Sequence, residues 1–201
     1  AIVLGMTFHS CLDLEPQDQL GGKNMWTSVN DYKQFANTFY SWTRDFSSVV
    51  YDGTHSDKRS DLITYQSYNE FSRGINSIPS SDANYTDNYK HIRRTNLLLQ
   101  NAEAYAKPED IKQYIGEAYF FRAYSYFDLL QLYGDVIITK KPLDITDPEM
   151  KVKRNDRSEV VDLIIDDLNH AVENLPAFKE LTTEEEGRIS KEGAQAFLSR
   201  V

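Results

Sequence analysis

The residues best suited to binding chemistry lie in a polar loop in the first third of the chain and at the start of the helix after it. Carboxylate and guanidinium groups bind polar ligands through paired hydrogen bonds, and aromatic rings offer flat apolar faces. Functional residues are also concentrated on loops. We therefore expect ligand contacts at Asp57, Arg59, Asp61, Tyr65, Tyr68 and Tyr85. This prediction rests only on residue type and on position in the loop or at the start of the helix. For each of these residues, a structural role is more common than ligand binding.

Three further candidates share these residue types: His55, Trp26 and Trp42. Trp42 lies on an apolar helical face, which favours a place in the core.

The sequence lacks the patterns of a catalytic or metal site. A glycosidase needs two carboxylates held across the scissile bond, and 31 acidic residues make chance pairs unavoidable. His91 and His170 have no His or Cys one turn away, and His9 and His55 show no metal-ligand spacing. Neither a Gly-rich phosphate loop nor a nucleophile elbow is present. We therefore expect no catalytic residue, no cofactor and no metal.

The charge balance argues against nucleic acid as a partner. The 201 residues carry 22 Lys and Arg against 31 Asp and Glu, a net charge of −9. Affinity for nucleic acid comes mainly from cations that neutralise phosphates. The 13 tyrosines suit both binding surfaces and the seams between packed helices. Size and charge indicate one soluble, surface-exposed domain.

The single cysteine stands at an abrupt change of polarity. Residues 1–8 include a run of apolar side chains, Ser10 is small, and Asp13 and Glu15 follow Cys11. An apolar run that ends in a small residue before a Cys is typical of a bacterial lipoprotein signal, whose cleavage leaves lipid on the Cys. We expect residues 1–10 to be the remnant of this signal, Cys11 the lipidated residue and residues 11–26 a tether to the membrane.

Apolar spacing and end signals predict helices joined by loops. Pro108, Gly134 and Ser190 are suited to helix ends, and Asp156 with Glu159 resembles a capping box. The predicted helices cover residues 27–45, 67–76, 83–105, 108–133, 157–175 and 190–201. Short extended segments are expected at 49–51 and 136–139, and charged loops at 140–155 and 179–188, the second one mobile. Two antiparallel hairpins of the tetratricopeptide type follow, without a clean repeat of about 34 residues.

The segment Gly116–Asp135 is apolar on two helical faces, so it has to be covered on both sides. Arg122 falls among these apolar positions, and a buried Arg needs a carboxylate or carbonyl partner. A polar stripe is expected to face water: Glu117, Asp128, Gln131 and Asp135. Small residues are expected where helices approach closely: Gly116, Ala123, Gly193 and Ala194.

Several of these segments together resemble one family. In order, the chain carries SCLDLEPQD, SDKRSDL, IRRTNLLLQNAE, IGEAYFFRAYSYFDLLQLYGDV, RSEVVDLIIDDLNHAVENLP and GRISKEGAQAFLSRV. This order is similar to that of the SusD/RagB family of Bacteroidota outer-membrane lipoproteins. Ile137 departs from the pattern, because members usually place a proline after Gly-Asp-Val. Members are also longer than this chain.

The resemblance implies a mostly α, tetratricopeptide-like stack of helix hairpins with long loops and little β structure. Residues 27–201 would be its N-terminal part, incomplete at the C-terminus. It further implies a lipid-anchored protein at the cell surface that binds glycan and delivers it to a SusC-like TonB-dependent transporter of the outer membrane. Other readings remain open: a RagB-like peptide binder, a tetratricopeptide-type scaffold for proteins, or a hydrolase whose active site lies beyond residue 201.

Overall fold

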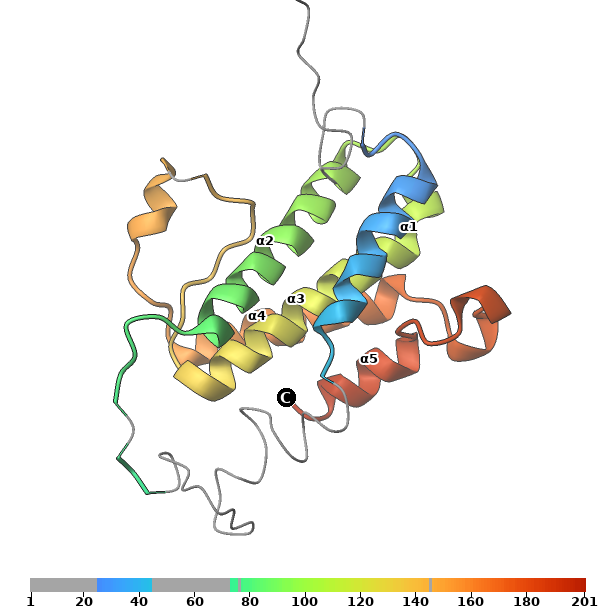
Figure 1. Cartoon of the computed structure of the whole chain (residues 1–201). Coiled ribbons are helices and arrows are strands. Elements are labelled where there is room, and N and C mark those ends of the chain that lie inside the picture. The colour runs from blue at the N-terminus through green and yellow to red at the C-terminus, as the bar shows by residue number, and fades with distance from the viewer. Residues whose placement is uncertain (1–24, 45–72, 76, 145) are drawn as a thin grey trace, which may run out of the picture.

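The computed structural model describes residues 25–44, 73–75, 77–144 and 146–201, and these form a stack of helices (Figure 1). The five α-helices are α1 (Val29–Asn37), α2 (Ala83–Glu103), α3 (Lys112–Tyr133), α4 (Arg157–Asn174) and α5 (Lys191–Leu198). Short 3-10 helices occupy Thr38–Trp42, Pro108–Ile111, Pro148–Lys151, Phe178–Glu180 and Thr183–Glu185. The mostly α fold is confirmed. Within the described residues, β structure is limited to one bridge between Val136 and Asn155.

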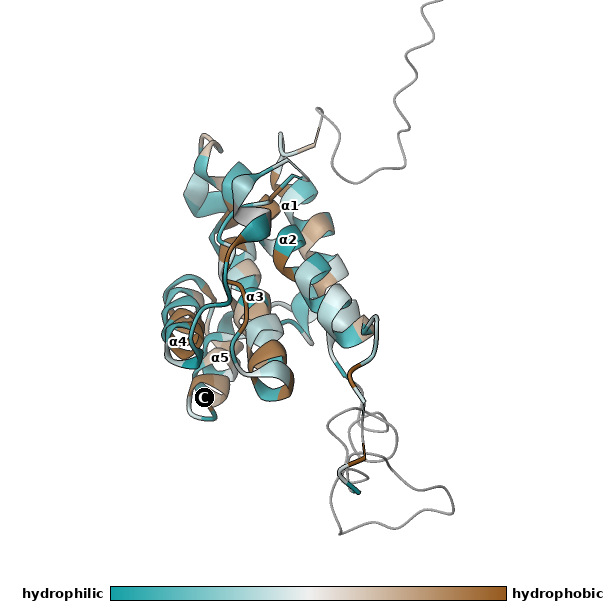
Figure 2. Ribbon diagram, turned by 90° about the vertical axis from the view of Figure 1, so that its left-hand side faces the viewer, coloured by the Kyte–Doolittle hydropathy of each residue, from teal (hydrophilic) through white to brown (hydrophobic). Residues whose placement is uncertain are grey.

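Helix α3 is the centre of the stack. It packs against α2, α4 and α1, and α4 in turn packs against α5. The side chains of Phe121, Tyr126 and Leu129 on α3 are almost wholly buried, so two of its faces are covered, as the sequence predicts. Figure 2 shows that the most hydrophobic residues lie mainly within the helices. No described helix is long and apolar enough to span a membrane.

The close approaches predicted from small residues are confirmed at the α3–α4 contact. A Cβ on Gly116 would stand 2.9 Å from Cγ of Leu175 and 3.0 Å from its backbone nitrogen. Because one of these atoms belongs to the backbone, a larger residue would force α3 and α4 apart. Ala123 and Ala194 are fully buried.

Polar side chains set where the helices begin and end. Asp82 caps α2 by accepting from the N–H of Asn84 at 2.9 Å. Gly134 ends α3 with a φ of 71°, a conformation that favours glycine. The next residue, Asp135, accepts from the first N–H of α4, that of Arg157, at 3.0 Å. The Gly-Asp pair therefore ends one helix and supports the start of the next.

Other helix ends also follow the predictions in part. Glu159 accepts from the N–H of Asp156 at 3.0 Å, as in a capping box. Ser190 caps α5, but α5 ends at Leu198 and does not continue to residue 201. The predicted helix 108–133 is divided into a 3-10 turn and α3. Of the predicted helix 67–76, the described residues 73 and 74 form a turn.

Arg122 has the carboxylate partner that its burial requires. Its side chain donates to both oxygens of Asp167 on α4, at 2.8 and 2.6 Å. A third N–H donates to the side-chain oxygen of Asn96 on α2, at 2.8 Å. Burial raises the pKa of Asp167, and the two donors of Arg122 oppose this rise. One buried cation therefore ties α2, α3 and α4 together.

The polar stripe was predicted wrongly at two of its four positions. Glu117 is fully buried and accepts two hydrogen bonds from Arg188, each of 2.8 Å. Asp128 is only 8% exposed and forms an ion pair with Arg44. Gln131 and Asp135 are exposed, as expected. The loop 179–188 contains the 3-10 turn Thr183–Glu185 and the end of another, Phe178–Glu180, and its last residue, Arg188, donates to the buried Glu117.

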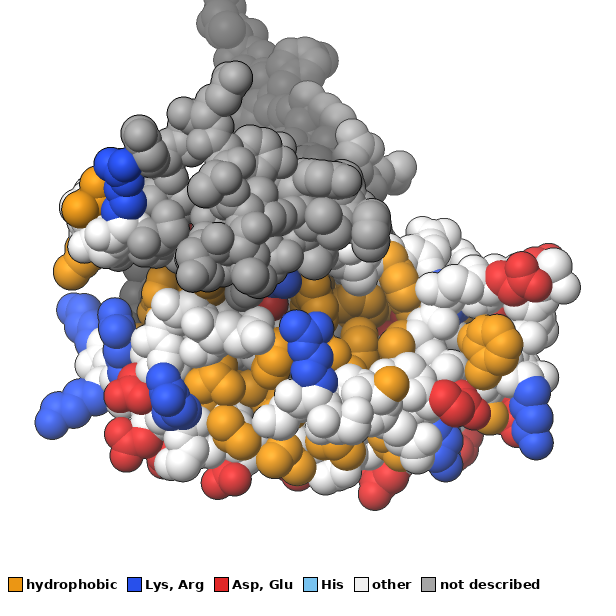
Figure 3. Space-filling model, turned by 90° about the horizontal axis from the view of Figure 1, so that it is seen from below, with side chains coloured by type: hydrophobic (Ala, Val, Ile, Leu, Met, Phe, Trp, Pro, Cys, Tyr) orange, Lys and Arg blue, Asp and Glu red, His pale blue; other side chains and the backbone are white. Residues whose placement is uncertain are grey.

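The face seen from below carries a band of hydrophobic side chains with a few charged ones among them (Figure 3). The aromatic ring of Phe197 on α5 packs against Phe120 and Phe127 of α3, with ring centroids 5.6 and 5.2 Å apart. These contacts hold α5 against the central helix.

Replacing Asp167 with Ala should lower the free energy of unfolding by about 3–5 kcal/mol, because Arg122 would remain as an uncompensated buried charge. Asp162→Ala, at an exposed position of the same helix, should change it by less than about 0.5 kcal/mol. Urea unfolding at neutral pH measures both values. Equal losses in the two variants would contradict the structural importance of the ion pair.

Candidate functional site

The extended segment Val136–Thr139 is held by two tyrosine hydroxyls from the neighbouring helices. The hydroxyl of Tyr89 on α2 accepts from the N–H of Ile137 at 2.9 Å and donates to its carbonyl at 2.8 Å. The hydroxyl of Tyr126 on α3 does the same at Thr139, at 2.7 and 3.2 Å. Ile137 and Thr139 are two residues apart, so both present their backbone to the same side.

Two asparagines complete the support of this segment. The side-chain amide of Asn96 donates to the carbonyls of Thr139 and Lys141, at 2.9 and 3.3 Å. The side-chain oxygen of Asn155 accepts from the N–H of Ile138 at 2.9 Å, on the alternate side of the segment. Because Asn96 also accepts from Arg122, the segment is joined to the buried ion pair.

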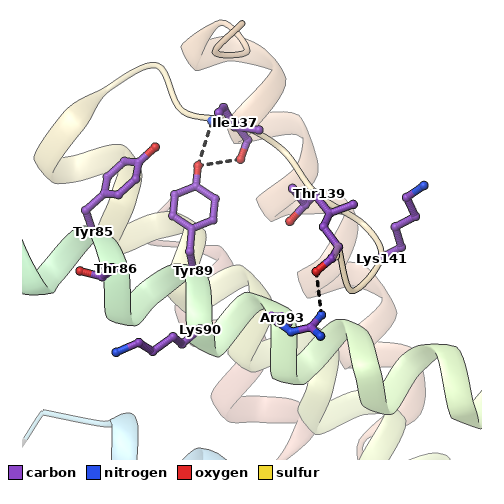
Figure 4. A pocket seen from close by; sticks show the side chains of 9 residues that line it. Tyr85, Thr86, Tyr89, Lys90, Arg93, Ile137, Thr139 and Lys141 are labelled. Carbon is purple, nitrogen blue, oxygen red and sulfur yellow. Dashed lines mark hydrogen bonds between the residues drawn. The ribbon is translucent and has the colours of Figure 1, made fainter. Parts of the chain in front are cut away.

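A pocket of about 340 Å³ lies between this segment and the first half of α2 (Figure 4). Its lining is Tyr85, Thr86, Tyr89, Lys90, Arg93, Ile137, Thr139, Lys141 and Leu143. Tyr85 and Tyr89 point from α2 toward the loop that carries Ile137 (Figure 4). Pockets of this size with aromatic walls and a few polar groups are the usual places for small ligands.

The aromatic wall of the pocket is fixed by contacts with the end of α3. The Tyr85 ring packs against those of Tyr89 and Tyr133, with centroids 4.8 and 5.2 Å away. The Tyr133 hydroxyl donates to the helix-capping Asp82 at 2.7 Å. Burial and the neighbouring Tyr85 raise the pKa of Tyr89 well above its usual value, so its hydroxyl stays protonated and keeps its hold on Ile137.

The charged side chains among the described lining residues are cationic. Arg93 donates to the carbonyl of Leu143 at 3.0 Å, which fixes it between α2 and the loop. Lys90 and Lys141 stand at the rim, with their amino groups directed outward in Figure 4. The site thus combines apolar rings with hydrogen-bond donors.

A second and smaller cavity, of about 190 Å³, lies on the other side of the first turns of α2. The Trp42 ring stacks there on His91, with centroids 4.1 Å apart. Arg44 and Asp128 form an ion pair in its wall. Burial lowers the pKa of His91 to about 4, so this imidazole is neutral at neutral pH. The packing of Trp42 on Phe39 and Phe121 fits the predicted core position.

Of the predicted ligand contacts, the structure places only Tyr85 in a pocket, because the others lie outside the described residues: Asp57, Arg59, Asp61, Tyr65 and Tyr68. Cys11, residues 1–10 and the segment 49–51 lie outside them too, as does His55. Trp26, placed in the predicted tether, packs its ring against Tyr32 and Phe35.

Sequence reasoning missed Tyr89, Arg93 and the segment 137–143 as pocket residues. One signal was available at Ile137, where the resemblance leads one to expect proline. A proline has no N–H, so it could not donate the hydrogen bond that Tyr89 accepts here. The departure at Ile137 therefore marks the segment whose backbone shapes the pocket.

The described residues thus define a tetratricopeptide-like helical protein that carries a ligand-sized pocket with aromatic walls. Residues 12–201 match the SusD-like family described as "Starch-binding associating with outer membrane". The chain belongs to this family.

Individual relatives agree with this assignment. SusD-like protein P38 of Formosa agariphila is 27% identical over 185 residues, which are 83% of this chain and 34% of that protein. Among solved structures, a SusD-like protein of Bacteroides fragilis aligns with a TM-score of 0.74 and 27% identity over 92% of this chain and 37% of its own. A laminarin-binding SusD-like protein aligns with a TM-score of 0.57 and 29% identity, over 65% of this chain and 28% of its own. The chain spans about a third of the length of these proteins.

Replacing Tyr89 with Phe should cost about 1–3 kcal/mol of stability, because it leaves the N–H and carbonyl of Ile137 without their partner. The amide of residue 137 should then exchange its hydrogen faster with solvent, which hydrogen-exchange mass spectrometry of the peptide around it detects.

Tyr119→Phe is the matched control. The hydroxyl of Tyr119 is half-buried on α3 and holds no loop backbone in the described part of the chain. Unchanged exchange at residue 137 in Tyr89→Phe would show that the hydroxyl does not hold the segment.

Proposed function

We propose that this chain is part of a cell-surface lipoprotein that binds glycan and passes it to a SusC-like TonB-dependent transporter of the outer membrane. Its family, described as starch-binding and associating with the outer membrane, supports this function. So does its likeness to a laminarin-binding SusD-like protein. The observation that carries the proposal is the pocket lined by Tyr85, Tyr89 and Arg93 in a chain of this family.

The chemistry of the pocket suits a sugar. One face of a pyranose ring is rich in C–H groups and packs on an aromatic ring, while its hydroxyls accept or donate hydrogen bonds at the edge. Tyr85 and Tyr89 supply ring surface, and Thr86 and Arg93 supply polar groups. Because the Tyr89 hydroxyl is already used by Ile137, a ligand meets the ring of this residue and not its polar tip.

The proposal includes no catalytic step. In the described residues no group of three or more His, Cys, Asp and Glu side chains is arranged to hold a metal ion. The acidic residues closest to the pocket, Asp87 and Asp144, form ion pairs with Lys90 and Arg93. In this proposal the glycan is captured and handed on intact.

Replacing Tyr85 with Ala should weaken glycan binding about tenfold, since a stacked aromatic ring contributes on the order of 1 kcal/mol beyond its buried area. Isothermal titration against a panel of soluble polysaccharides and peptides measures the affinity. Phe178→Ala is the control, because Phe178 is 69% exposed and lies outside the pocket.

Each result of this titration selects among the functions considered. Saturable glycan binding that is lost in Tyr85→Ala and kept in Phe178→Ala supports the proposal. Binding to peptides alone would assign the protein to the RagB-like alternative. Release of shortened sugars would reveal a hydrolase, and binding to proteins only would favour a scaffold.

We further propose that Cys11 carries the lipid that anchors the protein. Replacing Cys11 with Ala in the precursor should move the protein from the membrane fraction to the soluble fraction, because the acyl chains supply the membrane affinity. Cell fractionation with immunoblotting follows the change, and Gln17→Ala, which keeps Cys11 and the small residue before it, serves as the control. Continued membrane association of the Cys11→Ala precursor would refute the anchor.

A further inference from the structure

The charge around the pocket is opposite to that of the whole chain. Among the described residues, the charged side chains that line the pocket are Lys90, Arg93 and Lys141, and none of the lining residues is acidic. The chain as a whole carries 31 acidic against 22 basic side chains. A cationic site on an anionic protein attracts anionic ligands and disfavours other partners.

The acidic partners of Lys90 and Arg93 lie outside the lining and are exposed to solvent. Lys90 contacts Asp87 at 2.7 Å, with the two side chains 70% and 50% exposed. Nη2 of Arg93 lies 3.7 Å from Oδ1 of Asp144, and the side chains of Arg93 and Asp144 are 53% and 82% exposed. Exposed pairs of this kind contribute little net stability, so an incoming anion can replace or share them at little cost.

Arg93 is the cation that the structure positions best. Its Nη1 donates to the carbonyl of Leu143 across the pocket, and this bond holds the side chain in place without using its charge. A guanidinium has five N–H donors in a planar fork that matches the oxygens of a carboxylate or a sulfate. The adjoining Tyr89 and Ile137 side chains offer apolar surface to the ring of the same sugar.

We infer that the pocket is selective for acidic glycans, with Arg93 binding the anionic substituent of a sugar that packs on Tyr85. Lys90 and Lys141 at the rim attract neighbouring charged units of the same polymer. The substituent is a uronic acid carboxylate or a sulfate ester, which present the same negatively charged oxygens. This inference rests on the proposed glycan-binding function and specifies its substrate class.

The test compares polymers that differ only in charge. Polygalacturonate is titrated beside its fully methyl-esterified form, and dextran sulfate beside dextran. We expect the protein to bind at least one charged polymer about tenfold or more tightly than its neutral counterpart, and to lose this preference as salt is raised. The pair that shows the preference identifies the substituent as carboxylate or sulfate.

Variants separate the charge of Arg93 from its structural bond to Leu143. Arg93→Gln should reduce binding of the charged polymer about tenfold and that of the neutral polymer much less, because the neutral sugar loses one hydrogen-bond donor and no charge pairing. Arg93→Lys keeps the charge but loses the planar fork, so it should retain more of the preference than Arg93→Gln and less than the unchanged protein. Lys179→Gln, which removes an exposed cation outside the pocket, is the control. Equal losses in Arg93→Gln and Arg93→Lys would indicate a structural role and overturn the inference.

The remaining outcomes show whether the charge selectivity fails alone or together with glycan binding. Equal binding of charged and neutral polymers would refute the selectivity and leave glycan capture standing. Binding of acidic peptides with no binding of any glycan would refute both proposals.

Discussion

The arrangement of this protein depends on the neutralisation of one buried cation. Arg122 is 5% exposed on the central helix, and a guanidinium in such a place has to be paired. Asp167 on α4 and Asn96 on α2 meet its donors from two sides, so the helices on either side of α3 are fixed by the same group. Asn96 then extends the network to the carbonyls of Thr139 and Lys141, which carry the loop side of the pocket.

A second buried charge on α3, that of Glu117, joins this helix to the loop before α5. Glu117 faces away from the Arg122 network and accepts both donors of Arg188, whose guanidinium also lies over the rings of Tyr40 and Tyr114. Replacing a buried ion pair by apolar residues is often neutral for stability, whereas a mispaired charge is costly. The two pairs therefore act mainly by penalising other helix arrangements, and they specify which loop and which helix contact α3.

The parts of this structure that were predictable are those governed by local rules. Helix ends at Asp156, Ser190 and Gly134 follow from side chains a few residues away, and the burial of Arg122 follows from helical periodicity. Glu117 was assigned to the solvent side because its partner is 71 residues distant in a loop, where periodicity carries no information. Tyr85 was the predicted ligand contact that lies in the pocket. The opposite wall could not be predicted, because it is a loop whose position depends on hydrogen bonds with tyrosines far along the chain.

The abundance of tyrosine has a physical explanation that composition alone does not reveal. Loop segments outside a sheet need partners for their backbone groups, and a hydroxyl at the end of a rigid ring can supply one from a packed helix. Tyr89 and Tyr126 serve the segment 137–139 in this way, and Tyr40 accepts from the N–H of Ile189 in the loop before α5. Tyrosines with this task present at most their ring faces to a ligand. Under the proposed function, polar recognition in the pocket rests with Thr86, Arg93 and the lysines at its rim, and the charge of the ligand is a property that Arg93 can distinguish.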